Sequence, residues 1–299
     1  MTSVSTTTIV DVAWLRDAIS ASPSDVAVIE VTGDESHDGG AGVIPGSRSI
    51  HWKPLLWHDT RRELATARTL AGRLRDLGVG ADTEVVLAGA PTQFAAYAIW
   101  VATVAGVADR LHYLDGGLAA WSAAGFGETS RAVLPAASTP PASTPPVSTL
   151  PAPTRPTPSH PRPSVVIDRA GVENAIGSAS TGIVDLRSPQ EFSGQRVSPE
   201  TEIIDHGAQR HGRIPGARAL HVAELLDDDT RILPVDQLRE RVRAADLDSA
   251  TDLVFYCRLS HRAALGWLIF DEVLGDSRVR VYDGSWTEWG SVVGAPIEL

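Results

Sequence analysis

Short apolar runs rich in β-branched residues alternate along the chain with longer segments in which apolar positions recur every three or four residues. The short runs predict strands, and the longer segments predict helices. The expected strands lie at 26–31, 84–89, 182–186, 252–257 and 279–283. The expected helices lie at 67–78, 94–106, 235–247 and 262–275. This alternation predicts an α/β fold in which parallel sheets are covered by helices on both faces.

The pattern occurs twice in the chain. Segments 28–31, 43–52, 84–96 and 114–121 correspond to 183–186, 213–222, 252–264 and 282–289. Gly89 and Cys257 correspond at an offset of 168 positions, and Asp115 and Asp283 have the same offset. A constant offset indicates two copies of one structural unit. The second copy has about 15 additional residues before Ile214.

A proline-rich stretch lies between the two copies. Residues 131–163 hold 11 of the 20 prolines of the chain. Because proline lacks the backbone donor and fixes φ, such a stretch favours extended polyproline II or disorder over helix or sheet. We therefore predict a first domain at 1–130, a linker at 131–163 and a second domain at 164–299. An ordered loop over part of the linker is the alternative.

Charge and composition narrow the class of protein. The net charge of −11 argues against nonspecific binding to nucleic acid or to an anionic membrane. A single cysteine excludes an internal disulfide, which fits a reducing cytosol. The N-terminal residues show no signal-peptide pattern, and no apolar run approaches the roughly 18 residues of a membrane span. We expect a cytoplasmic, soluble protein.

The single cysteine, Cys257, lies where an expected strand turns into an expected helix. Ligands bind beyond the carboxyl ends of parallel strands, and a helix N-terminus offers backbone donors and positive potential. Arg258, His261 and Arg262 lie in the same turn, and cationic neighbours favour the reactive thiolate. A small buried cysteine without chemistry is the alternative interpretation. We interpret Cys257 as a nucleophile beside a site for a small anion such as phosphate, arsenate, sulfate or thiosulfate.

The loop length favours sulfur over phosphorus chemistry. A cysteine phosphatase has five residues between its cysteine and its arginine, whereas four residues separate Cys257 from Arg262, and Ala263 follows. A cradle shorter by one residue suits a persulfide sulfur better than a phosphoryl group.

Four motifs resemble a known family. They are CRLSHR at 257–262, DLR at 185–187, GRIPGA at 212–217 and YDGSWTEW at 282–289. On these residues the chain resembles a tandem-domain rhodanese, a thiosulfate sulfurtransferase. CRLSHR is similar to the loops of bacterial rhodaneses and unlike the CGSGVT-type loop of mercaptopyruvate sulfurtransferases. The resemblance implies two rhodanese-like domains, each a parallel-sheet core with helices on both faces.

The resemblance also implies a reaction and a site. Cys257 would take sulfane sulfur from thiosulfate as a persulfide and pass it to cyanide or a thiol. Substrate contacts would come from the rest of its loop, which comprises Arg258, Leu259, Ser260, His261 and Arg262. Asp185, Arg187 and Trp286 would support the loop, the first two as a structural ion pair, and no cofactor or metal is implied. Gly89 at the nucleophile position would make residues 1–130 non-catalytic, a cover for one side of the cleft.

Two positions depart from the pattern of vertebrate-type rhodaneses. Glu191 precedes Phe192 where those proteins carry an arginine, and Leu259 stands where they carry a lysine. The positive charge for thiosulfate would then come from Arg258 and Arg262, with His261 as a further candidate.

Alternative functions remain open at this point. One is a persulfide carrier that receives sulfur from a partner protein, and another is an enzyme that uses 3-mercaptopyruvate. A phosphatase or arsenate reductase on the same fold is a third. Small-molecule donor and acceptor, or a sulfur-relay protein, are the expected partners of a monomer.

Two further polar regions show no pattern of a binding site. The spacing of His206, His211, His221 and Asp205 fits no standard metal-ligand pattern. The glycine-rich segment 33–42 is interpreted as a mobile turn, because no Gly-Lys-Ser/Thr follows it.

Overall fold

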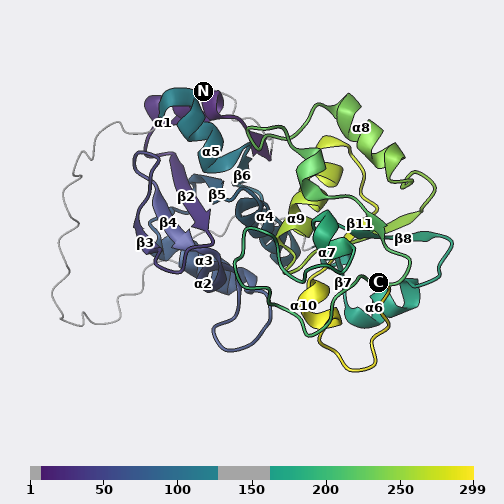
Figure 1. Cartoon of the computed structure of the whole chain (residues 1–299). Helices are drawn as coiled ribbons and strands as arrows, with labels where there is room; N and C mark the ends of the chain where they lie inside the picture. Colours follow the sequence, from purple (N-terminus) through teal and green to yellow (C-terminus); the bar gives the residue numbers. More distant parts are fainter. Residues whose placement is uncertain (1–7, 127–161) are drawn as a thin grey trace.

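The computed structural model describes residues 8–126 and 162–299, which form two α/β domains that lie side by side (Figure 1). The predicted linker therefore lies outside the described residues, apart from positions 162 and 163. Each predicted strand and helix corresponds to an observed element, with ends that differ by a few residues. The expected α/β class, with largely parallel sheets flanked by helices, is confirmed.

The first domain contains a six-stranded sheet in the order β1-β6-β5-β2-β4-β3. Its strands are β1 (Ile9–Val10), β2 (Val26–Thr32), β3 (Asp38–Ala41), β4 (Arg48–His51), β5 (Glu84–Ala90) and β6 (Leu111–Leu114). Its helices are α1 (Val12–Ala21), α2 (Trp52–Leu56), α3 (Ala67–Asp76), α4 (Gln93–Ala105) and α5 (Gly117–Trp121), followed by a π-helical turn, η1 (Ser122–Phe126). Neighbouring strands are parallel except for β3 and β4.

Alternating side chains of the central strands divide the first domain into two apolar layers. Ile29 of β2 and Leu87 of β5 pack with α2, α3 and α4. Val28 and Val86, which point to the opposite face, pack with α1 and α5. This two-sided burial explains why both strands read as nearly continuous apolar runs.

The interpretation of residues 33–42 as a mobile turn is wrong in part, because β3 lies within it. Asp38 pairs with Ile50 of β4, and the His51 backbone N–H donates to the His37 carbonyl at 2.8 Å. Gly39, at φ +102°, allows the irregular register of this edge pair. Backbone pairing of this kind leaves little trace in a glycine-rich sequence.

The second domain contains a parallel sheet in the order β7-β11-β10-β8-β9. Its strands are β7 (Val166–Ile167), β8 (Thr181–Asp185), β9 (Arg218–Ala219), β10 (Asp252–Tyr256) and β11 (Val279–Tyr282). Its helices are α6 (Arg169–Ala175), α7 (Pro189–Phe192), α8 (Val235–Ala244), α9 (His261–Leu268) and α10 (Ser285–Trp289). Short 3₁₀ turns lie at η2 (Pro163–Val165) and η3 (Val222–Leu225), and α9 continues into a π-helical turn, η4 (Ile269–Val273).

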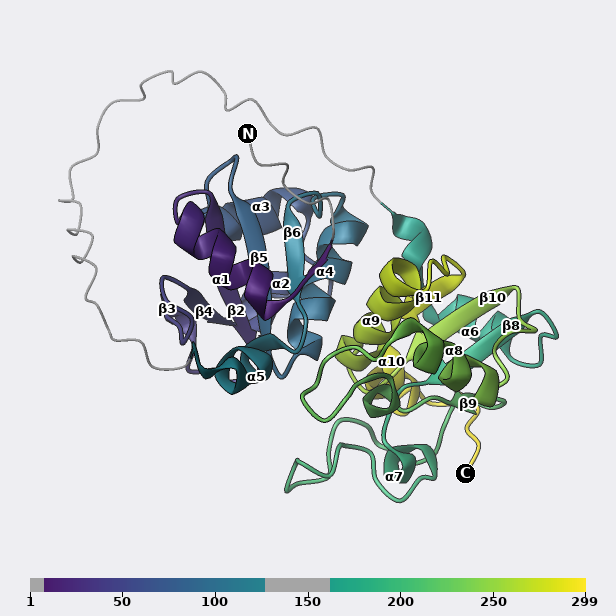
Figure 2. The same cartoon turned by 90° about the horizontal axis from the view of Figure 1, so that it is seen from above.

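The two domains meet along α4 and α9, which lie next to each other between the two sheets (Figure 2). Both helices are buried over most of their length, and one apolar cluster runs from the first domain into the second. Arg162 adds polar contacts at this interface. Its guanidinium donates to the Asp271 carboxylate at 2.7 and 2.9 Å, and its backbone N–H donates to the Thr103 carbonyl of α4. The helix α9, which follows the cysteine, is therefore packed against both domains.

Within the described parts of the chain, none of the helices combines the length and the apolar character that crossing a membrane requires.

Candidate active site

Strand register places Cys257 at the carboxyl edge of the second sheet. β10 is paired in parallel with β8 and β11, with Tyr256 opposite Asp185 and Phe255 opposite Val281. Cys257 directly follows β10, so that it lies beside the residues that follow β8 and β11. Those residues include Arg187 and Asp283 of the DLR and YDGSWTEW motifs.

The first turn of α10 holds the backbone of the cysteine loop. The Cys257 N–H donates to Ser285 Oγ at 3.2 Å, and the Trp286 N–H donates to the Cys257 carbonyl at 2.9 Å. Thr287 donates to the Arg258 carbonyl through its N–H at 3.1 Å and its hydroxyl at 2.9 Å. Sequence reasoning named only Trp286 here, although Ser285 and Thr287 lie in the same quoted motif. These bonds fix the loop without using the cysteine side chain.

Ser260 has an unusual backbone conformation at the end of the loop. Its φ is +72°, in the left-handed region that non-glycine residues adopt at a cost of roughly 1–2 kcal/mol. Its hydroxyl donates to the Asp283 carbonyl at 2.5 Å. Ser260, predicted to contact substrate, is thus bonded to the polypeptide segment that follows β11.

The Cys257 side chain is enclosed in this structure. It is 1% exposed and belongs to the apolar cluster that extends across the α4–α9 interface. The thiol itself is therefore covered in this structure, at the place where the sequence predicted a site for a small anion.

Arg262 is buried and fully engaged by Glu191. Its guanidinium donates to both Glu191 carboxylate oxygens, at 2.7 and 2.8 Å. Burial by itself would raise the pKa of Glu191. The pKa is nevertheless lowered, because the carboxylate accepts hydrogen bonds from Arg262 and is attracted to its positive charge. Burial likewise opposes the charge of Arg262, but Glu191 raises the pKa of Arg262, and the nearby Cys257 adds to this effect. Glu191, noted in the sequence only as a departure, therefore neutralises one of the two expected anion-binding arginines.

Arg258 is held by residues 202–207, which lie in the region where the second copy has additional residues. Its guanidinium donates to Glu202 Oε1 at 2.6 Å and to the His206 carbonyl at 3.2 Å. Gly207, at φ +114°, permits this approach, because a Cβ there would lie 2.9 Å from Arg258 Nη1. The second expected anion-binding arginine is therefore also paired with a carboxylate.

His261 is the first residue of α9 and packs against the first domain. Its ring lies edge-on to Trp52, Phe94 and Tyr97, with ring centroids 4.3, 4.8 and 4.8 Å away. Burial, followed by the positive charges of Arg258 and Arg262, lowers the pKa of His261 well below its usual value. The aromatic surroundings and the lowered pKa favour a neutral His261 ring, whereas the sequence suggested His261 as a further source of positive charge.

A polar cluster from both domains surrounds Asp283. Arg62 of the first domain donates to Asp283 Oδ2 at 2.7 Å and to its carbonyl at 3.1 Å. Tyr97 donates to Asp283 Oδ1 at 3.0 Å and accepts from the Trp57 indole at 2.9 Å. The Asp283 carbonyl thus accepts hydrogen bonds from both Arg62 and Ser260, which links the first domain directly to the cysteine loop.

Asp185 and Arg187 form a buried ion pair behind the loop, at 2.7 Å. Asp185 also accepts from the Tyr256 hydroxyl at 2.7 Å, and Arg187 donates to the Gly212 carbonyl at 2.8 Å. The Arg187 guanidinium lies 4.5 Å from the Trp286 ring centre. The pair joins the ends of β8 and β10 to the GRIPGA motif. Leu259 is half-buried at the tip of the loop.

The position in the first domain that corresponds to Cys257 has no space for a side chain. A Cβ on Gly89 would lie 2.6 Å from both the Cα and the carbonyl oxygen of Thr92. The backbone of the first domain therefore excludes a nucleophile at Gly89 by sterics as well as by sequence.

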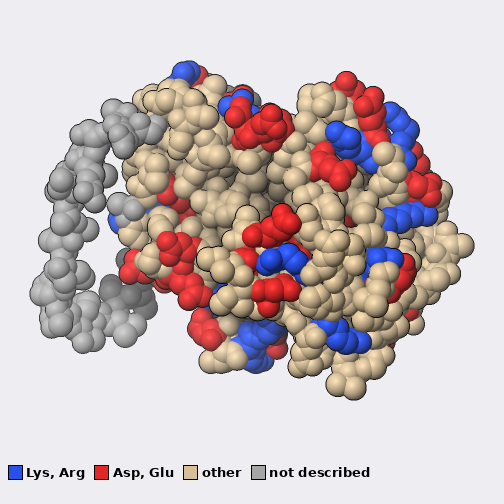
Figure 3. Space-filling model, viewed as in Figure 1, with Lys and Arg blue, Asp and Glu red and all other residues tan. Residues whose placement is uncertain are grey.

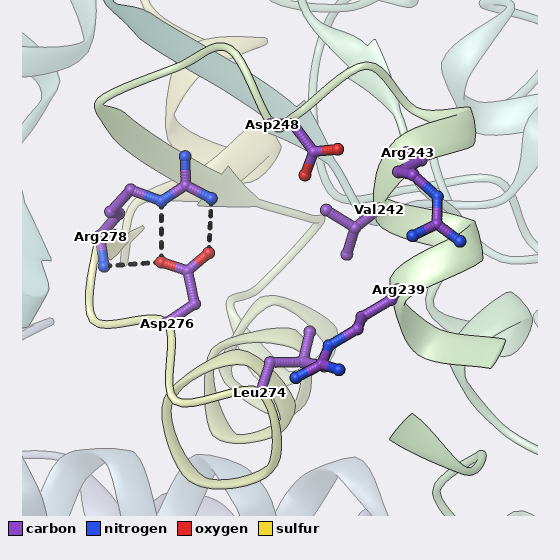
Figure 4. A pocket seen from close by; sticks show the side chains of 7 residues that line it. All are labelled: Arg239, Val242, Arg243, Asp248, Leu274, Asp276 and Arg278. Atoms are coloured by element: carbon purple, nitrogen blue, oxygen red, sulfur yellow. Dashed lines mark hydrogen bonds and ion pairs between the residues drawn. The ribbon is translucent and has the colours of Figure 1, made fainter. Parts of the chain in front are cut away.

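Other polar groups do not assemble into a second centre. The described residues include no group of three His, Cys, Asp or Glu side chains placed to hold a metal ion. A hollow of about 230 Å³ lies between α8 and the loop before β11 (Figure 4). Arg239 and Arg243 line it, and Arg278 there is paired with Asp276 at 2.6 Å. No residue of the 257–262 loop lines this hollow, so it is separate from the candidate site.

The charged surface shows the same tendency toward pairing. On the face in Figure 3, Lys and Arg side chains lie beside Asp and Glu rather than forming one continuous basic area.

Comparison with known proteins connects these features to a family. The model of the family described as "Rhodanese-like domain" matches residues 11–124 and again 168–291. A Saccharopolyspora erythraea protein named "Putative thiosulfate sulfurtransferase" is 33% identical over 275 residues, which cover 91% of this chain and 90% of that protein. A Thermus thermophilus protein named "Sulfur carrier protein TtuD" is 30% identical over 257 residues, which cover 86% of this chain and 85% of that protein.

Solved structures show the same fold. The wild-type structure of EanB matches with a TM-score of 0.71 at 23% identity, covering 97% of this chain and 69% of that one. The crystal structure of YnjE matches with a TM-score of 0.68 at 24% identity, covering 97% and 68%. At this level of identity the likeness concerns the fold.

Proposed function

The chain belongs to the rhodanese family, in which it has two domains in tandem, and on that premise we propose that it is a sulfurtransferase that carries sulfane sulfur on Cys257. The observation that carries the proposal is the position of the only cysteine, at the carboxyl end of β10 in a loop fixed by α10. The match to the family model and the similarity to named relatives confirm, at the level of the family, the resemblance drawn from the four motifs.

We propose thiosulfate as a donor, because several relatives are named for it. The Cys257 thiolate attacks the outer sulfur of thiosulfate, the S–S bond breaks, and sulfite leaves with the bonding electron pair. The persulfide anion on Cys257 then gives its terminal sulfur to cyanide or a thiol, which restores the thiolate. Backbone N–H groups of the loop and the N-terminus of α9 would stabilise the negative sulfur.

The first domain, within 1–130, has a supporting role in this proposal. Gly89 leaves no space for a nucleophile, while Trp52, Phe94 and Tyr97 cover one side of the cysteine loop at His261. We propose a second domain at 164–299 that performs the chemistry, and a linker at 131–163. We further propose that the protein acts as a cytoplasmic monomer on small molecules or with a sulfur-relay protein, and without nucleic acid.

A persulfide carrier is the second candidate. Two observations favour it: both arginines of the loop are paired with carboxylates, and a relative is named as a sulfur carrier. Such a protein would form the same Cys257 persulfide, but its donor would be a protein or another persulfide, and 3-mercaptopyruvate is a further donor to test.

A phosphatase or arsenate reductase has less support. Such chemistry needs an arginine free to hold a tetrahedral oxyanion, whereas both Arg262 amino groups are bonded to Glu191. Hydrolysis of p-nitrophenyl phosphate by the wild-type protein would support this alternative instead.

Mass spectrometry tests the proposed function. After treatment with thiosulfate, the Cys257 peptide of the wild-type protein should gain one sulfur atom, and cyanide should remove it as thiocyanate. Cys257→Ser should neither gain sulfur nor release sulfite. Sulfite release by Cys257→Ser at the wild-type rate would refute the role of the thiol. Persulfide formation from a protein donor without thiosulfate turnover would select the carrier.

A further inference from the structure

The segment 194–211 of the second domain packs on Arg258 of the cysteine loop and places a carboxylate against it. It lies within the region where the second copy has additional residues, between β8 and β9. Glu202 of this segment contacts Arg258, the residue that follows the nucleophile, at 2.6 Å. The Arg258 side chain is largely buried by this contact, by the His206 carbonyl and by Gly207.

We propose that Glu202 determines which sulfur donors are used: it masks the Arg258 guanidinium and thereby disfavours dianionic donors such as thiosulfate relative to hydropersulfides. This inference rests on the proposed function, in which Cys257 accepts sulfane sulfur. Glu202 acts through Arg258 and has no part in bond breaking, so it is a positioning residue rather than a catalytic one.

No other side chain of the loop compensates for the masked charge. Arg262 is bonded to Glu191 through both amino groups, and His261 is held neutral. Leu259 adds an apolar side chain. Glu202 of the segment 194–211 and Glu191 of α7 therefore balance the two arginine charges of the 257–262 loop. The loop arginines keep no net charge to attract a dianion.

The two classes of donor differ in the charge that accompanies the transferred sulfur. Thiosulfate brings two negative charges, and near Arg258 it must either displace Glu202 or share the guanidinium with it. Like charges placed close together oppose binding. In a hydropersulfide, RSSH, the terminal sulfur is neutral: the Cys257 thiolate attacks it, RS⁻ leaves with the bonding pair, and the proton remains on the transferred sulfur. A masked Arg258 opposes this reaction much less.

The test compares Glu202→Gln with a matched variant. Glu200→Gln removes the same charge two residues away, from an exposed side chain. The donors are sodium thiosulfate and cysteine hydropersulfide, with sulfur on Cys257 measured by mass spectrometry and initial rates measured at low and high NaCl.

Glu202→Gln should lower the KM for thiosulfate roughly tenfold at low salt, with kcat little changed. Its KM for cysteine hydropersulfide should change by less than about twofold, and the gain for thiosulfate should shrink at high salt. Glu202→Asp, which keeps the charge, should restore the wild-type preference. Equal effects on both donors, or equal effects of Glu200→Gln and Glu202→Gln, would overturn the proposal, because either result indicates a change in folding or in overall charge.

A binding measurement separates this inference from the proposed function. In a Cys257→Ser background, where no sulfur can be transferred, Glu202→Gln should still bind thiosulfate roughly tenfold more tightly than Glu200→Gln by titration calorimetry. Failure of the wild-type protein to form a persulfide with any donor would refute the proposed function. Equal thiosulfate affinities in the two Cys257→Ser double variants would refute the role of Glu202, whatever the outcome for Cys257.

Discussion

Arg62 of the first domain and Asp283 of the second form an ion pair with an N–O distance of 2.7 Å. Arg62 also donates to the Asp283 carbonyl, which accepts the hydroxyl of Ser260 in the cysteine loop. A residue far from Cys257 in the sequence thereby contacts the carbonyl that is bonded to the cysteine loop. The contact gives the first domain a structural influence on the cysteine loop.

Arg62→Ala should weaken sulfur transfer more than it weakens folding. The Arg62 side chain is 37% exposed, so solvent screens the pair and its loss should cost at most about 1 kcal/mol of unfolding free energy. The loosened Asp283 carbonyl should lower kcat several-fold. Urea unfolding and sulfite release measure the two effects. Arg61→Ala, which removes an exposed pair with Glu63, is the control and should leave both quantities unchanged.

Removing either partner of the Arg262–Glu191 pair should be costly. Arg262→Ala leaves the Glu191 carboxylate buried without its counter-charge, and such losses typically cost about 3–5 kcal/mol. We also expect sulfur transfer to fall on the order of 100-fold, because the Arg262 charge that lies close to Cys257 is lost. Chemical denaturation and initial rates provide the measurements.

The matching double variant separates these contributions. Arg262→Leu combined with Glu191→Leu removes both charges and should recover most of the stability lost in Arg262→Leu alone. Additive losses in the double variant would show that the two side chains stabilise the fold independently. Activity should stay low in the double variant, because the guanidinium close to Cys257 is absent.

Substitutions at Ser260 should distinguish hydrogen bonding from backbone strain. Ser260→Ala loses the bond to the Asp283 carbonyl and keeps a side chain at φ +72°, so it should destabilise the protein by roughly 1–2 kcal/mol. Ser260→Gly loses the same bond but relieves the strain, so that its unfolding free energy should stay closer to wild type. Thermal unfolding measures the order of the two variants. Greater stability of Ser260→Ala than of Ser260→Gly would contradict this account.

Stability should depend on the protonation of His261. The folded-state pKa of His261 lies well below the usual value of 6.5, so the unfolded chain binds the proton more readily. The contribution of the neutral ring is therefore fully present above pH 6.5 and is lost progressively as the pH falls below it. Denaturation between pH 7.5 and about 5 should show this decline in the wild type.

His261→Phe should weaken that pH dependence, because phenylalanine fits the same aromatic surface and takes up no proton. The exposed His211→Gln serves as the control and should follow the wild-type curve. An unchanged slope in His261→Phe would show that other groups cause the acid sensitivity.

The sequence by itself determined the elements, the repeat and the position of the thiol. The strands at 252–256 and 84–90 are buried on both faces. A strand buried on both faces consists almost entirely of apolar residues, so it can be recognised from the sequence. The location of Cys257 after β10 follows from the same local pattern. The edge strand β3 was missed because its glycine-rich residues are held by backbone hydrogen bonds, which require no particular side chains.

Only the tertiary structure decided the charge of the site. In the sequence, Arg258, His261 and Arg262 form a cationic turn with no acidic residue beside it. Folding brings Glu202 and Glu191 to the two arginines from more than 50 residues away and surrounds His261 with rings of the other domain. Ion pairing and burial depend on three-dimensional proximity, which local residue patterns do not encode. They cover the thiol and pair both arginines of its loop with carboxylates.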